Sequence, residues 1–284
     1  MDLTTASQEQ LSALQTELEQ QFEVQKQAGL KLDLTRGKPS SDQLALSESL
    51  DGILAGDYTL DGTDLRNYGG LDGLPSTKAL FAPVLDVDTS EILIGGNSSL
   101  TLMHQCITFC HLMGLTEPDS AWSNKGPTKF LCPVPGYDRH FSVCEHLGIE
   151  MIPVGLDDNG PDMDEVEALV KSDSHIKGIW CVPRFSNPTG CVYSADTVER
   201  LAKLGSIASE GFKVFYDNAY AVHSLTDNAP ELPSLMAACK ANGTEDSVLM
   251  FGSTSKVTFA GSGISFVGAS QANIKAITKH IGLL

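Results

Sequence analysis

The amino-acid sequence predicts an α/β fold, a three-layer αβα domain built around a mainly parallel sheet. Short apolar runs alternate with helical patterns along most of the chain, and this alternation is typical of parallel sheets that helices cover on both faces. The 284 residues are enough to bury a substantial core. Apolar residues make up 42% of the chain and charged residues 19%, which is the balance of a globular protein.

The first expected element is an amphipathic helix over residues 7–25. Ser7 and Gln10 have the spacing of a capping box at its start. The apolar residues that recur there at three- and four-residue steps are Leu11, Leu14, Leu18 and Phe22. Residues 30–78 are rich in Gly, Asp, Ser and Pro, and we expect mostly loop with short elements there.

The remainder of the chain carries the alternation of strands and helices. The expected strands are Phe130–Cys132, Met151–Val154, Gly178–Val182, Lys213–Tyr216, Val248–Phe251 and Ile264–Val267. The expected helices are 100–113, 138–147, 163–171 and 194–210. Ligands of such sheets bind at the carboxyl ends of the strands, so functional side chains are expected just after each strand.

Charge and composition exclude several classes of protein. The formal net charge of −17 argues against a nucleic-acid partner. No apolar run is long enough to span a bilayer, and the N-terminus lacks the pattern of a secretory signal, so we expect a cytoplasmic protein without a membrane partner. The seven cysteines form no CxxC pair and the histidines show no metal-ligand spacing, which predicts reduced, buried thiols and no metal site.

Polar residues follow three of the expected strands. Strand 178–182 leads to Asn187-Pro-Thr-Gly, strand 213–216 ends on Asp217 with Tyr220 three residues later, and strand 248–251 leads to Ser253-Thr-Ser-Lys256. Each feature alone has an ordinary explanation as a turn, a helix cap or a solvated lysine. Together they bring an amide, a carboxylate, a phenol and an amine to one edge of one sheet.

In order and spacing, these residues resemble the fold-type-I pyridoxal-phosphate enzymes, specifically the class I aminotransferases. The resemblance runs from about Leu32 to the end of the chain. Its strongest motifs are NPTG at 187–190, Asp217-x-x-Tyr220 and SxSK at 253–256. The stretches LTRGKP at 34–39, RNYGG at 66–70 and GGNSSL at 95–100 are similar to a divergent aspartate aminotransferase subgroup.

The resemblance implies a pyridoxal 5'-phosphate cofactor and gives roles to the strongest motifs. Lys256 would carry the cofactor as a Schiff base and move a proton between the substrate α-carbon and the cofactor. Asp217 would lie beside the pyridine nitrogen and keep it protonated, because an opposite charge favours the charged form. Asn187 and Tyr220 would hydrogen-bond the phenolic oxygen of the ring.

The resemblance also implies roles for residues outside these motifs. Tyr137 would stack on the cofactor ring and His140 would hold Asp217, unless it is an ordinary surface-helix histidine. Tyr68 would reach the phosphate of a neighbouring subunit in a homodimer, unless it is an ordinary loop aromatic. The residues implied to bind the phosphate, beside a glycine-rich turn that feeds a helix N-terminus, are Asn97, Ser98, Ser99 and Ser253, and Ser255 is a further implied cofactor-binding residue.

The sequence departs from the family pattern at two places. The arginine expected eight residues after the lysine is replaced by Ile264, and 257–268 contains neither Arg nor Lys, so hydroxyls, backbone amides and a helix dipole would hold the phosphate.

The family also continues into a C-terminal small domain that binds the substrate α-carboxylate. We expect that domain to be absent here, with an N-terminal helix and arm at 1–50 and a large cofactor-binding domain at 51–284. Arg36 and Arg184 are candidate carboxylate contacts, although ordinary surface charge explains both.

The expected function is transfer of an amino group between an amino acid, for which aspartate is the first candidate, and a 2-oxo acid such as 2-oxoglutarate. One alternative is another pyridoxal-phosphate reaction on the same scaffold, such as that of a β-lyase. A second alternative is a truncated, inactive cofactor-binding or dimerising module. The effector domain of a transcription regulator is disfavoured, because no helix-turn-helix signal or basic region precedes the domain.

Overall fold

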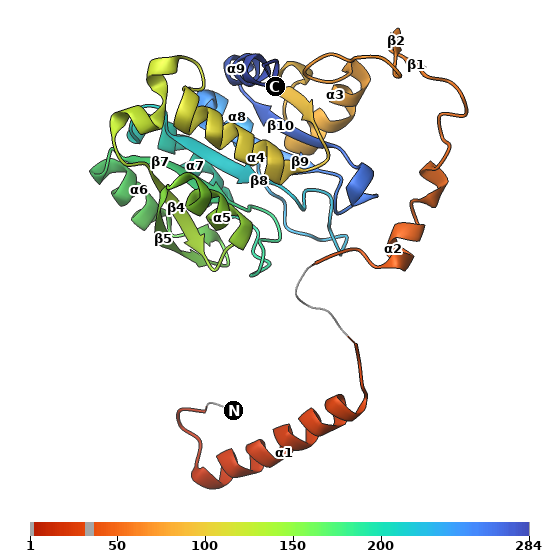
Figure 1. Cartoon of the computed structure of the whole chain (residues 1–284). Helices are drawn as coiled ribbons and strands as arrows, with labels where there is room; N and C mark the ends of the chain where they lie inside the picture. The colour runs from red at the N-terminus through yellow and green to blue at the C-terminus, as the bar shows by residue number, and fades with distance from the viewer. Residues whose placement is uncertain (1–2, 32–36, 284) are drawn as a thin grey trace. The chain divides into compact units, whose positions relative to one another are not determined.

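The computed structural model describes residues 3–31 and 37–283 (Figure 1). Its contacts group the chain into two compact units, Met1–Ser40 and Ser41–Leu284. The expected division at residue 50 stays a prediction. Within the described residues, no helix combines the length and the apolar character that crossing a membrane requires.

The first unit contains the long helix α1 (Gln8–Gln27). Ser7 and Gln10 close the predicted capping box, because Ser7 Oγ accepts the Gln10 N–H at 3.3 Å and Gln10 Oε1 accepts the Ser7 N–H at 2.9 Å. None of its residues is buried. The helix therefore owes its local start to capping, and its predicted apolar stripe stays on the surface of the unit.

The second unit is built on an eight-stranded sheet. In spatial order its strands are β3 (Ile92–Gly95), β10 (Ser265–Ala269), β9 (Val248–Ser253), β8 (Lys213–Asp217), β7 (Ile176–Cys181), β4 (Lys129–Val134), β5 (Glu150–Asp157) and β6 (Gly160–Pro161). The five strands from β9 to β5 are parallel, whereas β10 is antiparallel to both of its neighbours. The predicted mainly parallel sheet is confirmed, and β3 runs in the same direction as β9.

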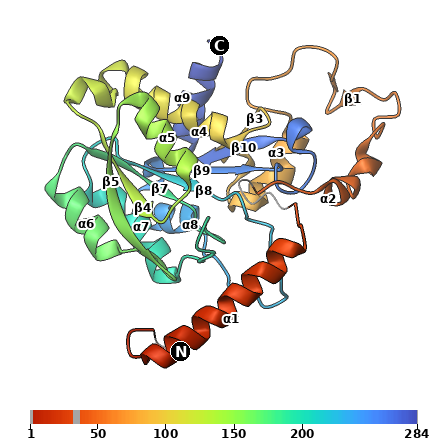
Figure 2. The same ribbon diagram turned by 60° about the horizontal axis from the view of Figure 1, so that its bottom comes forward.

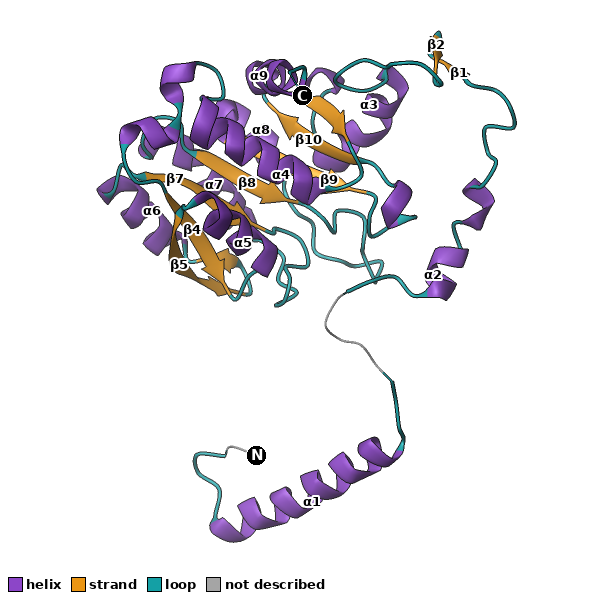
Figure 3. Ribbon diagram, viewed as in Figure 1, coloured by secondary structure: helices purple, strands orange, loops and turns teal. Residues whose placement is uncertain are grey.

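Helices cover both faces of this sheet (Figure 3). One core cluster joins it to α6 (Met163–Ser172), α7 (Ala195–Ile207) and α8 (Leu235–Asn242). A second cluster joins it to α4 (Ser99–Thr108), α5 (Asp138–Leu147) and α9 (Gln271–Ile281). Consecutive residues of β7 enter different clusters, Ile179 the first and Trp180 the second, as the alternation of side chains along a strand requires. The two clusters confirm the three-layer prediction.

Further short elements complete the second unit (Figure 2). A small antiparallel hairpin joins β1 (Thr59–Leu60) to β2 (Thr63–Asp64). The short helices are α2 (Ser41–Ala45) and α3 (Pro75–Phe81), and α4 continues into a π-helical turn at Phe109–Met113. The 3₁₀ segments are Glu48–Leu50, Ala82–Leu85, Thr89–Glu91, Pro118–Ser120, Trp122–Lys125, Glu245–Ser247 and Ala260–Ser262.

All six predicted strands and all the predicted helices are present, with small shifts at their ends. Helix α7 stops at Ile207 rather than at 210, because Ala208 is extended. The elements that sequence patterns did not predict are β3, β6, α3, α8 and α9. The seven cysteines are free and buried, as predicted.

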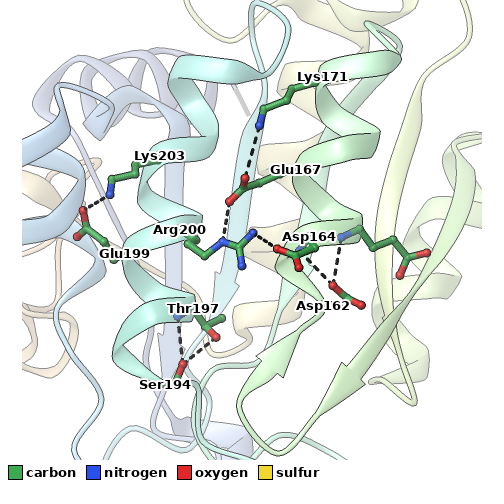
Figure 4. Close-up of polar contacts among 10 residues, drawn as sticks. Asp162, Asp164, Glu167, Lys171, Ser194, Thr197, Glu199, Arg200 and Lys203 are labelled. Carbon is green, nitrogen blue, oxygen red and sulfur yellow. Dashed lines mark hydrogen bonds and ion pairs between the residues drawn. The ribbon is translucent and has the colours of Figure 1, made fainter.

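Charged pairs join the outer surfaces of α6 and α7 (Figure 4). Arg200 Nε lies 2.7 Å from Glu167 Oε1, and Arg200 Nη2 lies 2.6 Å from Asp164 Oδ1. The hydrogen bond from Arg200 lowers the pKa of Glu167, and those two carboxylates raise the pKa of Arg200. Exposed pairs of this kind contribute at most about 1 kcal/mol each, so packing onto the sheet remains the main restraint on these helices.

Gly178 in β7 provides a test of that packing. A Cβ atom at this position would overlap the ring of Phe130 on the neighbouring strand β4. Gly178→Ala should therefore lower the free energy of unfolding by about 1–3 kcal/mol, the usual cost of overfilling a core. Urea unfolding measures the change. Gly155→Ala is the matched control, because its Cβ would make only ordinary van der Waals contacts, with Asp162 Cβ at 3.7 Å and Glu165 Oε2 at 3.9 Å. Equal stability of the two variants would contradict the packing described here.

Candidate functional site

The predicted polar residues gather at the carboxyl edge of the sheet. Strand β8 ends on Asp217, strand β9 ends on Ser253, and strand β3 ends on Gly95 just before the glycine-rich turn. These strands run in one direction, so their ends meet at one edge.

Asp217 is the buried acid at the centre of this edge. Its Oδ2 lies 3.0 Å from Nε2 of His140, and the two residues are only 4% and 1% exposed. A carboxylate can only accept hydrogen bonds, so His140 Nε2–H is the donor. Asp217 Oδ1 is buried and has no hydrogen-bond partner among the described residues. A buried acceptor without a partner is costly, which marks Oδ1 as the place where a ligand's donor would fit.

His140 lies inside the domain, in the first turn of α5, rather than on the surface of its helix. Tyr137, at the N-cap of the same helix, meets the His140 ring edge-on with centroids 5.1 Å apart and planes at 86°. The spacing of three residues brings both side chains to one face of the helix start. Burial, and then the charge of Asp217, raise the pKa of Tyr137.

Tyr220 lies beside Asp217 and Asn187. Burial and then the charge of Asp217 raise the pKa of the Tyr220 phenol, while a hydrogen bond with the Asn187 side chain lowers it. The His223 ring meets Tyr220 edge-on at 5.6 Å, and His223 Nε2 lies 3.0 Å from the carbonyl oxygen of Lys256. This histidine links the Asp217–Tyr220 segment to the lysine loop. Sequence reasoning missed it, and its only signal is its position three residues after Tyr220.

The loop that carries Lys256 is closed by two hydrogen bonds between Thr254 and Ile264. The Thr254 N–H donates to the Ile264 carbonyl at 2.8 Å, and the Ile264 N–H donates to Thr254 Oγ1 at 2.9 Å. Ser255 Oγ donates to the Asn97 carbonyl at 3.2 Å, which ties the loop to the glycine-rich turn. Ile264, at the position of the family arginine, therefore contributes its backbone to the shape of the loop.

The N-terminus of α4 points its first N–H groups into the same region. Ser98 is the N-cap, and its Oγ accepts the Thr101 N–H at 3.3 Å. Ser99 is the first helical residue, and the Asn97 amide donates to the Gly261 carbonyl at 3.2 Å. Helix N-terminal N–H groups with neighbouring hydroxyls form a suitable anion site without a basic side chain.

The remaining predicted residues are Tyr68, Arg184 and Arg36. Tyr68 is fully exposed, at 100% of its accessible surface. Arg184 Nη2 donates to Ser224 Oγ at 2.9 Å, and its guanidinium lies 5.4 Å from the Phe185 ring. Arg36 lies outside the described residues.

Comparison with known proteins identifies the family. The model of a family described as aspartate amino-transferase matches residues 6–284. The chain belongs to this family. A relative from Mycolicibacterium smegmatis is 49% identical over 273 residues, which cover 94% of this chain and 64% of that protein. An aspartate aminotransferase from Corynebacterium glutamicum is 44% identical over 277 residues, which cover 97% of this chain and 64% of that protein. The chain thus spans less than two thirds of the length of these relatives.

Solved structures show that the family fold is shared. An aspartate transaminase from Corynebacterium glutamicum superposes with a TM-score of 0.88 at 43% identity, over 100% of this chain and 67% of that one. The fold alone is shared with an α-aminoadipate aminotransferase from Thermus thermophilus, solved with N-(5'-phosphopyridoxyl)-L-leucine, at a TM-score of 0.68 and 21% identity, over 87% of this chain and 58% of that one. The resemblance to fold-type-I aminotransferases is confirmed.

The effect of Asp217 on Tyr220 is directly testable in the cofactor-free protein. Asp217→Asn removes a negative charge that disfavours the phenolate, so the pKa of Tyr220 should fall and the phenolate should form at lower pH. Carbon-13 resonances of the tyrosine Cζ atoms follow this titration. Asp138→Asn is the control, because Asp138 raises the pKa of Tyr137 and is not among the causes of the Tyr220 shift. An unchanged Tyr220 titration in Asp217→Asn would contradict the arrangement.

Proposed function

We propose that the protein is a pyridoxal 5'-phosphate-dependent aminotransferase that exchanges an amino group between aspartate and 2-oxoglutarate. The observation that carries this proposal is the buried, unpartnered Oδ1 of Asp217, with Tyr220, Asn187 and Lys256 gathered at the same edge of the sheet. Family membership supports the reaction class, and the aspartate aminotransferase from Corynebacterium glutamicum supports aspartate as the substrate.

The residues present fit this cofactor. Asp217 Oδ1 offers an acceptor for a protonated pyridine nitrogen, and Asn187 with Tyr220 offers donors for the phenolic oxygen. Tyr137 would flank the ring. The phosphate would bind at the α4 N-terminus, where the available groups come from Asn97, Ser98, Ser99 and Ser253. Ser255 would support the site from the loop, because its hydroxyl donates to the Asn97 carbonyl and its N–H donates to Ser253 Oγ. When bound, the cofactor supplies an electron sink for the electron pair left by removal of the substrate α-proton.

Each side chain then has a defined task. Asp217 would keep a proton on the ring nitrogen, because its negative charge favours the cationic form. His140 donates to Asp217 Oδ2, which leaves Oδ1 as the oxygen that would accept a hydrogen bond from the cofactor. Lys256 would provide the amine that holds the cofactor and would then move the proton at the substrate α-carbon.

We further propose that the active unit is a homodimer with a two-fold axis. Tyr68 is an aromatic residue whose whole side chain is exposed, and its phenol would complete the phosphate site of a second subunit. Asp64 and Arg66 precede it in a bidentate ion pair, with Nε–Oδ1 at 2.8 Å and Nη2–Oδ2 at 2.7 Å.

Covalent attachment at Lys256 is the first test. Protein incubated with pyridoxal phosphate and reduced with tritiated borohydride should carry the label in the peptide that contains Lys256. Lys256→Ala should lose this label, whereas Lys275→Ala, on the distant helix α9, should keep it. Peptide mapping by mass spectrometry decides the outcome. A label on another lysine, or none at all, would remove the proposed function.

The dimer has its own test. Tyr68→Phe should weaken cofactor binding by about 10- to 100-fold, the usual effect of losing a hydrogen bond to a charged group, and leave the dimer intact. Tyr58→Phe is the control, because Tyr58 lies under the Arg66 guanidinium at 5.3 Å and keeps that ring contact. Sedimentation velocity and cofactor titration measure both effects. The shared site would be refuted if the native protein sedimented as a monomer while binding the cofactor, or if Tyr68→Phe bound the cofactor as tightly as the native protein.

A further inference from the structure

We propose that Trp180 is a positioning residue for this site, whose indole ring holds His140 against Asp217 by contacting two residues of α5 at once. The catalytic consequence of this proposal rests on the proposed function. The positioning itself is a property of the cofactor-free chain and can be tested separately.

The contact with α5 involves two positions one helical turn apart. His140 and Cys144 are four residues apart, so they share the face of α5 that points to the sheet. The Trp180 ring stacks on the His140 ring with centroids 4.5 Å apart and planes at 10°, and its Nε1–H donates to Cys144 Sγ at 3.2 Å. One side chain therefore restrains both the tilt of the imidazole and the position of its helix.

Two phenylalanine rings from the neighbouring strands pack against the Trp180 indole. Trp180 is 2% exposed in strand β7, and its ring contacts Phe130 at 5.5 Å and Phe215 at 4.9 Å. These aromatic rings come from the neighbouring strands β4 and β8, and protein cores are packed too densely to let them shift freely. Packing in the central sheet therefore fixes the position of the Trp180 ring, and this ring in turn restrains His140.

The position of His140 decides which oxygen of Asp217 is left unpartnered. His140 Nε2 binds Oδ2 at 3.0 Å, and Oδ1 remains without a partner among the described residues. If the imidazole moves, Asp217 Oδ1 and Oδ2 compete for the His140 Nε2–H donor. The Asp217 oxygen that would accept a hydrogen bond from the cofactor then no longer has a fixed orientation. Trp180 would therefore act on turnover through the Asp217 carboxylate, without touching substrate or cofactor.

A core tryptophan with no special role is the alternative, and Trp122 provides the matched control. It is the other tryptophan of the chain, is 3% exposed, donates its Nε1–H to the Gly211 carbonyl at 3.1 Å and also packs on Phe130 at 5.7 Å. Gly211 precedes the start of β8, whereas Asp217 is at its end. In the described part of the chain, no ring contact joins Trp122 to His140.

The first readout is the nitrogen-15 spectrum of the His140 imidazole in the cofactor-free protein. The native protein should show one tautomer, protonated at Nε2. Trp180→Leu should shift or average these resonances, and Trp180→Phe, which keeps a stacking ring, should change them less. Cys144→Ala should have a smaller effect in the same direction, and Cys144→Ser, which keeps an acceptor, should have almost none. Trp122→Leu should leave them as in the native protein, although it lowers stability.

The second readout is steady-state kinetics of the cofactor-loaded protein. Trp180→Leu should lower kcat about tenfold, the usual scale for residues that orient a functional side chain, with KM for the amino acid within about twofold. The proposal would be overturned if the His140 resonances of Trp180→Leu were the same as in the native protein. It would also be overturned if Trp122→Leu changed these resonances as much as Trp180→Leu does. Failure of the cofactor to bind would instead refute the proposed function and leave the first readout intact.

Discussion

The burial of the Asp217 carboxylate is the constraint on which the rest of the site depends. A carboxylate in a dry interior is stable only if charges or hydrogen bonds compensate its lost hydration. In this chain His140 compensates one oxygen, and the other is buried without a partner among the described residues. This oxygen can accept a hydrogen bond from a ligand, and the protonated pyridine ring of the proposed cofactor would supply that donor.

The topology of the sheet explains how a lysine and an anion site come to face this carboxylate. Strand β10 lies between β9 and β3 and runs against both. The chain must therefore turn back after β9, and that turn is the loop with Lys256, which Thr254 and Ile264 close through two hydrogen bonds. The same arrangement brings the glycine-rich turn after β3 beside the loop. A family arginine is absent at position 264, and in the proposed function the α4 N-terminus with its serines would bind the anion instead.

Sequence patterns predict the features that depend on residues close together along the chain. The strands that precede Asp217 and Lys256 and the capped helix after Ser7 follow from periodicity and spacing, and the matched motifs place the polar residues at one edge. Features that depend on tertiary contacts stay hidden. Strand β3 has only four residues and no clear alternation, the reversed direction of β10 has no local signal, and His223 and Trp180 gain their importance only when distant segments pack together. The resemblance placed His140 beside Asp217, but spacing alone did not distinguish it from a surface histidine.

The central claim is that Asp217 Oδ1 keeps the ring nitrogen of the cofactor protonated. Nitrogen-15 NMR of the protein loaded with ring-labelled pyridoxal phosphate measures that protonation without requiring turnover. The native protein should show the chemical shift of a protonated pyridine throughout the neutral pH range, because the buried carboxylate stabilises the cation. Asp217→Asn should show the shift of an unprotonated ring with the cofactor still bound. The same protonated shift in both proteins would contradict the account.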